Sequence, residues 1–131
     1  MTPFELYFYP IFGTGLIIAL FASIAAGKTS RILLAVIFML IGIGSFWGSL
    51  FIGSEVGYQM WQSMPNPPDV AFNDTMPMGA LIAGWVPACI FCGFIFGATK
   101  AFCLLFNSRL KSNEQAIVSA IETGNPYQTP Q

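Results

Sequence analysis

Residues 79–99, GALIAGWVPACIFCGFIFGAT, contain no charged side chain. At a rise of about 1.5 Å per residue, a helix over this run is long enough to cross the roughly 30 Å hydrocarbon core of a bilayer. Two further apolar runs precede it, at residues 11–26 and 32–52. The sequence therefore predicts an all-α integral membrane protein with three transmembrane helices.

The composition agrees with this prediction and argues against several function classes. Hydrophobic residues make up 55% of the 131 residues, charged residues 8%, and the net charge is −1. Such a chain has no basic patch that would neutralise nucleic-acid phosphates. It also contains no His, the commonest general base and metal ligand. We therefore expect neither a nucleic-acid-binding protein nor an enzyme, and we expect no cofactor.

The first apolar run has small residues along one side. Stepped at 100° per residue, Gly15, Ala19 and Ser23 fall on the same side of a helix over residues 11–26. Small side chains let a second membrane helix approach closely, which is how such helices associate in lipid. Residues 1–10 contain four aromatic side chains, a residue type that gathers at the membrane–water interface. We expect them to anchor the start of the first helix.

A polar break at residues 27–31 separates the first run from the second and predicts an antiparallel helical hairpin. In the second helix, residues 32–52, Gly44 and Gly48 are four residues apart. We expect close packing of this half of the helix against another helix, because small residues at this spacing form one row on its surface. A neighbouring row of small residues consists of Ser45, Ser49 and Gly53.

Residues 54–78 are expected to form a loop rather than a helix. Four prolines forbid a long helix there, although residues 56–64 can make two turns at the membrane interface. A connection of this length is more often functional than a plain connector. We therefore expect a surface that recognises a partner within this loop.

The third transmembrane helix is expected to span residues 79–106, with Pro87 kinking it near Ala83. A short amphipathic helix is then expected at residues 112–123, followed by a disordered tail at 124–131. The small residues Cys89, Gly93 and Gly97 are spaced at four and predict a helix-packing row, with packing against the chain's own first or second helix favoured over contact between chains. The sector expected to be buried contains Trp85, Cys89, Cys92, Gly93, Phe96, Lys100 and Cys103.

Two groups of sulfur-containing residues offer metal chemistry, and each also has a structural interpretation. Cys89 and Cys92 are three apart on the third helix, where two thiols can converge on one soft metal ion. Packing is the favoured interpretation, because Cys is a small residue and neither His nor a carboxylate lies nearby in the sequence. Four of the six methionines lie in residues 54–78, where their thioethers favour Cu(I) or simply fill packing gaps. These candidate ligands are Met60, Met64, Met76 and Met78.

The distribution of charge predicts the orientation of the chain in the membrane. All five Lys and Arg residues lie in the first connection or after the third run, whereas residues 1–10 and 54–78 carry acidic residues only. By the positive-inside rule, the N-terminus is outside and the C-terminus is cytoplasmic. Residues 65–87, PNPPDVAFNDTMPMGALIAGWVP, are similar to a passage of small bacterial membrane proteins. The three apolar runs predict a multi-pass protein, and with this resemblance we expect it in the bacterial inner membrane.

These observations leave three function hypotheses. The leading one is a non-enzymatic accessory subunit that packs its helices against other membrane chains, because every predicted helix carries a row of small residues. The second is a homo-oligomeric channel or transporter, against which stands the lack of carboxylates or paired charges within the predicted helices, since the only charged candidate, Lys100, lies at an end. The third is an extracytoplasmic Cu(I)-binding protein. The expected partners are the lipid bilayer and other membrane chains or further copies of this one.

Overall fold

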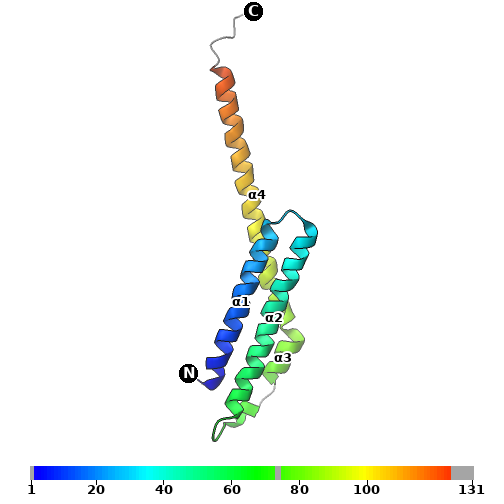
Figure 1. Ribbon diagram of the computed structural model, residues 1–131, viewed down its shortest axis with the longest axis vertical. Helices are drawn as coiled ribbons and strands as arrows, with labels where there is room; N and C mark the ends of the chain where they lie inside the picture. Colours follow the sequence, from blue (N-terminus) through cyan, green and yellow to red (C-terminus); the bar gives the residue numbers. More distant parts are fainter. Residues whose placement is uncertain (1, 73–74, 125–131) are drawn as a thin grey trace, which may run out of the picture.

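The computed structural model describes residues 2–72 and 75–124, which are almost entirely helical (Figure 1). The helices α1 (Pro3–Lys28) and α2 (Ile32–Gln62) form an antiparallel hairpin. A 3₁₀ helix, η1 (Asp69–Phe72), and the short α3 (Thr75–Ala83) lead to α4 (Trp85–Thr123). Within the described residues, α1, α2 and α4 are long and apolar enough to cross a membrane. The fold is therefore that of a multi-pass membrane protein.

Helix α1 begins at Pro3, eight residues before the transmembrane helix expected at 11–26. The cause is a capping box: the backbone N–H of Glu5 donates to Thr2 Oγ1 at 3.3 Å, and the backbone N–H of Thr2 donates to Glu5 Oε2 at 2.8 Å. Pro3 occupies the first turn, where no backbone donor is needed. The aromatic residues near the N-terminus therefore lie on the helix itself.

Helix α2 continues to Gln62, ten residues beyond its expected end at Ile52. These extra turns pack on the start of α1, where the ring of Phe4 lies 5.1 Å from that of Tyr58 and 6.3 Å from that of Trp61. Tertiary packing therefore extends the helix to Gln62, shortly before the first proline of this region, Pro65. As a result, much of the loop expected at 54–78 is helical. Its first residues belong to α2, η1 lies in its middle, and its last residues form the first turn of α3.

The helix expected at 79–106 is divided at Gly84 into α3 and α4. Pro87 has no N–H to donate to the carbonyl of Ala83, so the hydrogen-bond ladder cannot continue through this point. At this point the carbonyl of Ala80 accepts two hydrogen bonds at 3.0 Å: the ordinary helical bond from the backbone N–H of Gly84, and a second one from Trp47 Nε1. The indole of α2 thus holds the break in place.

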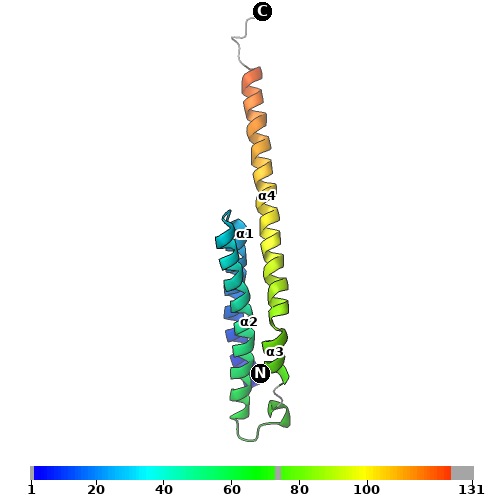
Figure 2. The same ribbon diagram turned by 90° about the vertical axis from the view of Figure 1, so that its right-hand side faces the viewer.

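Helix α4 runs without interruption to Thr123, so residues 112–123 continue the third spanning helix instead of forming a separate one. No Pro or Gly lies between Gly97 and Thr123, so nothing in this stretch favours a break. Figure 2 shows α4 extending far past the turn that joins α1 and α2. Of the expected tail at 124–131, residues 125–131 lie outside the described part of the chain.

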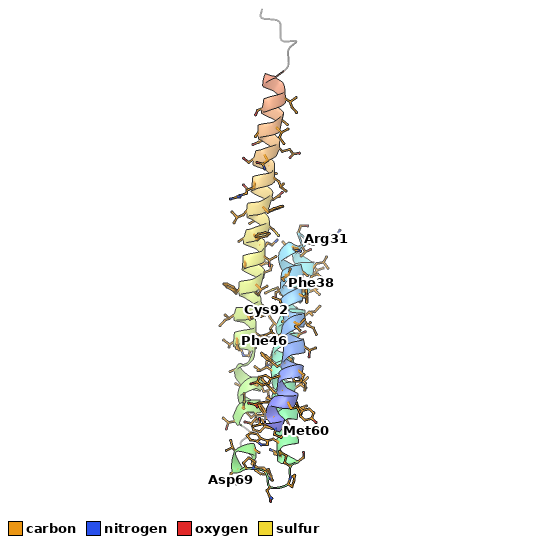
Figure 3. All side chains as sticks on the ribbon, turned by 90° about the vertical axis from the view of Figure 1, so that its left-hand side faces the viewer. Arg31, Phe38, Phe46, Met60, Asp69 and Cys92 are labelled. Carbon is orange, nitrogen blue, oxygen red and sulfur yellow. The ribbon has the colours of Figure 1, made fainter. Side chains whose placement is uncertain are left out.

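The three long helices meet in a narrow core built mainly from small residues. Ala19, Phe46, Ala88 and Cys92 are buried together, with larger side chains packed around them. Figure 3 shows Phe46 and Cys92 at neighbouring heights along the bundle. Hydrophobicity cannot drive helices together in lipid, so small buried residues that allow close contact are the expected basis of this packing.

Candidate functional site

The hairpin interface is built on the small residues of α1. Gly15, Ala19 and Ser23 are all buried there. A Cβ atom added to Gly15 would lie 1.9 Å from Ser49 Oγ and 2.7 Å from the carbonyl oxygen of Ser45, so only a glycine fits at this crossing. The first row of small residues thus lies inside the chain, opposite the Ser45, Ser49 and Gly53 row of α2.

Further glycines also pack inside the chain, and of Gly27, Gly53 and Gly57 sequence reasoning assigned only Gly53 to a packing row. Gly53 and Gly57 lie against the rings of Phe8 and Phe4. The shared spacing of four between the two glycines and between the two phenylalanines was the available signal. Gly27 lies against α4, where an added Cβ would lie 2.6 Å from the Cβ of Thr99.

The remaining glycines of the predicted packing rows face away from the chain's own helices. A Cβ added to any of Gly44, Gly48, Gly93 and Gly97 would meet nothing within 4 Å. Cys89, which belongs to the same row as Gly93, is exposed. The glycines of the chain therefore fall into two groups: some pack inside its own helix bundle, and others lie open on its surface. We call Cys89, Gly93 and Gly97 the open row of α4.

The buried face of α4 is rotated from the sector expected to be buried. Ala88 and Cys92 are fully buried, whereas Trp85 and Cys89 are exposed. Cys92 is the residue that meets α2, since a Cβ added to Gly42 would lie 3.4 Å from its sulfur. Helix stepping defines rows well, but it does not decide which of two adjacent rows meets the neighbouring helix.

The candidate metal ligands differ in burial and in the elements that carry them. Cys92 is buried in the bundle, whereas Cys89 is exposed on another side of α4. Met60 and Met64 are exposed at the end of α2. Met76 and Met78 lie on α3 and line different surface cavities. Among the described residues, no group of three or more His, Cys, Asp and Glu side chains is arranged to hold a metal.

The end of the bundle at the turn between α1 and α2 is basic. Lys28 and Arg31 are exposed there, and the half-buried Lys100 of α4 donates from Nζ to the carbonyl oxygen of Thr29 at 3.1 Å. This carbonyl lies at the C-terminus of α1, where a cation is favoured by the helix dipole. Lys100 therefore ties α4 to the hairpin, a contact between residues 71 apart that sequence reasoning did not predict.

Beyond this basic end, α4 carries apolar side chains that have no neighbouring helix in the described structure. The rings of Phe102 and Phe106 stack with their centroids 6.2 Å apart. Leu110 and Ile117 are exposed farther along the same helix. Cys103, Phe106, Leu110 and Ile117 follow a spacing of three, four and seven residues, which brings them to one side of the helix.

Comparisons with known proteins do not assign the chain to a family. No protein-family model matches the sequence, and no curated protein or solved structure shows a significant similarity to it.

Proposed function

We propose that this chain is a non-enzymatic accessory subunit that packs against another membrane protein chain through the open row of α4. The observation that carries the proposal is that Gly93 and Gly97 have nothing within 4 Å of an added Cβ. Small residues spaced at four let helix backbones approach closely, and this packing is a main source of association between helices in lipid. Glycines already allow this close approach between helices inside the chain, at Gly15 and Gly27.

The part of α4 beyond the basic end offers a second surface for packing against another chain. Phe106, Leu110 and Ile117 lie on one side of this segment and are 53% to 61% exposed. Apolar residues at this spacing form the seam of helix pairs in water. Stepped at 100° per residue, this seam lies in line with the buried Ala88 and Cys92 and on a different side of α4 from the open row, so it offers a separate surface on which another helix can pack.

We further propose that the N-terminus is extracytoplasmic and the C-terminus cytoplasmic, in a bacterial inner membrane. The positive-inside rule supports this orientation, because Lys28, Arg31 and Lys100 gather at one end of the bundle. Glu5 lies in the first turn of α1 and Glu55 in the last part of α2, at the ends of these helices away from the turn that joins them. The projecting segment of α4 is then cytoplasmic.

The proposal is tested by native mass spectrometry of the full chain after mild extraction from its own membrane. We expect a heterologous membrane chain to accompany the wild type, and we expect the double variant Gly93→Leu, Gly97→Leu to lose it. Both positions are open in the chain itself, so the variant should keep its helical content by circular dichroism.

The matched control is Phe94→Leu, which changes a 74% exposed side chain between the two glycines and should retain the partner. A lone monomer in the wild-type sample, or a partner kept by the double variant, would contradict the proposal. A homo-oligomer would replace it with the channel or transporter hypothesis, which flux measurements in vesicles would then examine.

A further inference from the structure

A cavity of about 320 Å³ lies at the basic end of the bundle, between the first turns of α2 and the facing side of α4. Its walls are mostly apolar, and polar groups lie at the end nearest the turn between α1 and α2. Lys100, Thr29 and Ser30 supply the polar groups. The apolar lining consists of Ile32, Ala35, Val36, Met39, Leu40 and Phe96.

The polar end of this cavity is positively charged. Lys100 lines it, and Lys28 and Arg31 flank the same turn. Figure 3 shows Arg31 at the tip of the hairpin. The sequence has no Asp or Glu between Glu5 and Glu55, and the first acidic residue after Lys100 is Glu114. Glu114 lies 14 residues along α4, about 21 Å away, which is too far to neutralise the end of the cavity.

The start of α2 adds to this positive potential. Its N-cap residue is Arg31, which makes no side-chain capping hydrogen bond, and the first turn contains no acidic residue. Backbone N–H groups at the start of a helix favour a nearby anion. The cationic side chains and this helix end therefore act in the same direction.

We propose that this cavity binds one anionic phospholipid of the surrounding membrane. The lipid phosphate lies beside Lys100 and Ser30, and one acyl chain follows the apolar wall past Met39 and Phe96. Charge complementarity selects an anionic headgroup, because a zwitterionic lipid would bring its ammonium group to a cationic cluster that offers no carboxylate. The length of apolar wall favours a lipid over free phosphate. This site is separate from the open row of α4 and does not depend on the proposed partner.

The test measures lipid retention by the full chain in native mass spectrometry, with phosphatidylglycerol and phosphatidylcholine of identical acyl chains added in equal amounts. We expect the wild type to prefer phosphatidylglycerol about fivefold, which corresponds to the roughly 1 kcal/mol that one Lys contributes near an anionic surface. Lys100→Gln should lower the ratio clearly, leaving only the part that Lys28, Arg31 and the start of α2 supply, and Lys100→Arg should preserve it. Inorganic phosphate at millimolar concentration should not displace the lipid.

The charge control is Lys111→Gln, which removes the same charge from an exposed position of α4 that does not line the cavity. It should leave the preference unchanged. Ala35→Trp, which fills the apolar part of the cavity, should lower retention of both lipids. An equal loss of preference in Lys100→Gln and Lys111→Gln would overturn the proposal, as would a wild type with no preference. Displacement by inorganic phosphate would reassign the site to a free anion.

Discussion

At the scale of single residues, Gly15 and Gly13 make a direct test of the hairpin interface. Both are glycines in α1, but an added Cβ at Gly15 would overlap Ser49 and approach the Ser45 carbonyl, whereas one at Gly13 would meet nothing within 4 Å. We expect Gly15→Ala to destabilise the bundle by about 1–3 kcal/mol through overpacking. Gly13→Ala should be neutral or slightly stabilising, because Ala is the better helix former. Unfolding in mixed micelles, followed by circular dichroism, measures both changes.

Part of the Gly15 effect should be reversible by a second substitution. Ser49→Gly removes the side chain that an added methyl group overlaps, but the Ser45 carbonyl still lies 2.7 Å from the new Cβ. The pair Gly15→Ala, Ser49→Gly should therefore recover some of the lost stability and not all of it. Equal stability of Gly15→Ala and Gly13→Ala would show that the two helices do not cross at this point.

At the scale of elements, the apolar runs predicted the three spanning helices, but not where each helix ends. The ends depend on neighbours that a single run does not reveal. Helix α2 continues because Tyr58 and Trp61 pack on Phe4, a contact between distant parts of the sequence. The break before α4 was closer to prediction, since Pro87 already indicated a defect near Ala83. The hydrogen bond from Trp47 that holds this break comes from another helix and left no local signal.

The same limit applies to the candidate site. Rows of small residues were visible in the sequence, but their division into internal and open rows was not. Gly44 and Ser45 are adjacent in α2, yet the Ser45 backbone meets α1 and Gly44 meets nothing within 4 Å. This choice depends on a rotation of each helix by about 100°, the angle between neighbouring residues. Amphipathicity would normally fix that rotation, but in lipid both faces of a helix are apolar.

A truncation after Ser108 tests whether the projecting part of α4 is an independent element. The residues of α4 beyond this point whose exposure is described are all exposed, so their removal should take no packing from the bundle. We expect helical content to fall while the thermal midpoint in detergent moves by less than about 4 °C, equivalent to under about 1 kcal/mol. A larger drop would mean that this segment supports the bundle directly.

At the scale of the whole molecule, the bundle is held together by little buried volume. Its largest fully buried side chains are those of Cys92, Ser23 and Ser54. Close backbone approach, stacked rings near the N-terminus and the Lys100 contact with Thr29 stabilise the arrangement in place of a large core. A chain of this kind leaves most of its surface to lipid or to other helices, so we expect binding at its open glycine surfaces and at its charged end.

The proposed orientation of the chain in the membrane can be tested at two exposed serines, one toward each end of the molecule. Ser63 follows α2 at the end away from the basic cluster, whereas Ser112 lies on the projecting part of α4. In a background with Cys89, Cys92 and Cys103 changed to Ala, we expect Ser63→Cys to react with a membrane-impermeant maleimide in intact spheroplasts. Ser112→Cys should react only after lysis. Because Lys and Arg resist transfer across the membrane during insertion, the basic end should stay cytoplasmic. The opposite labelling pattern would invert the topology and place the projecting segment outside the cytoplasm.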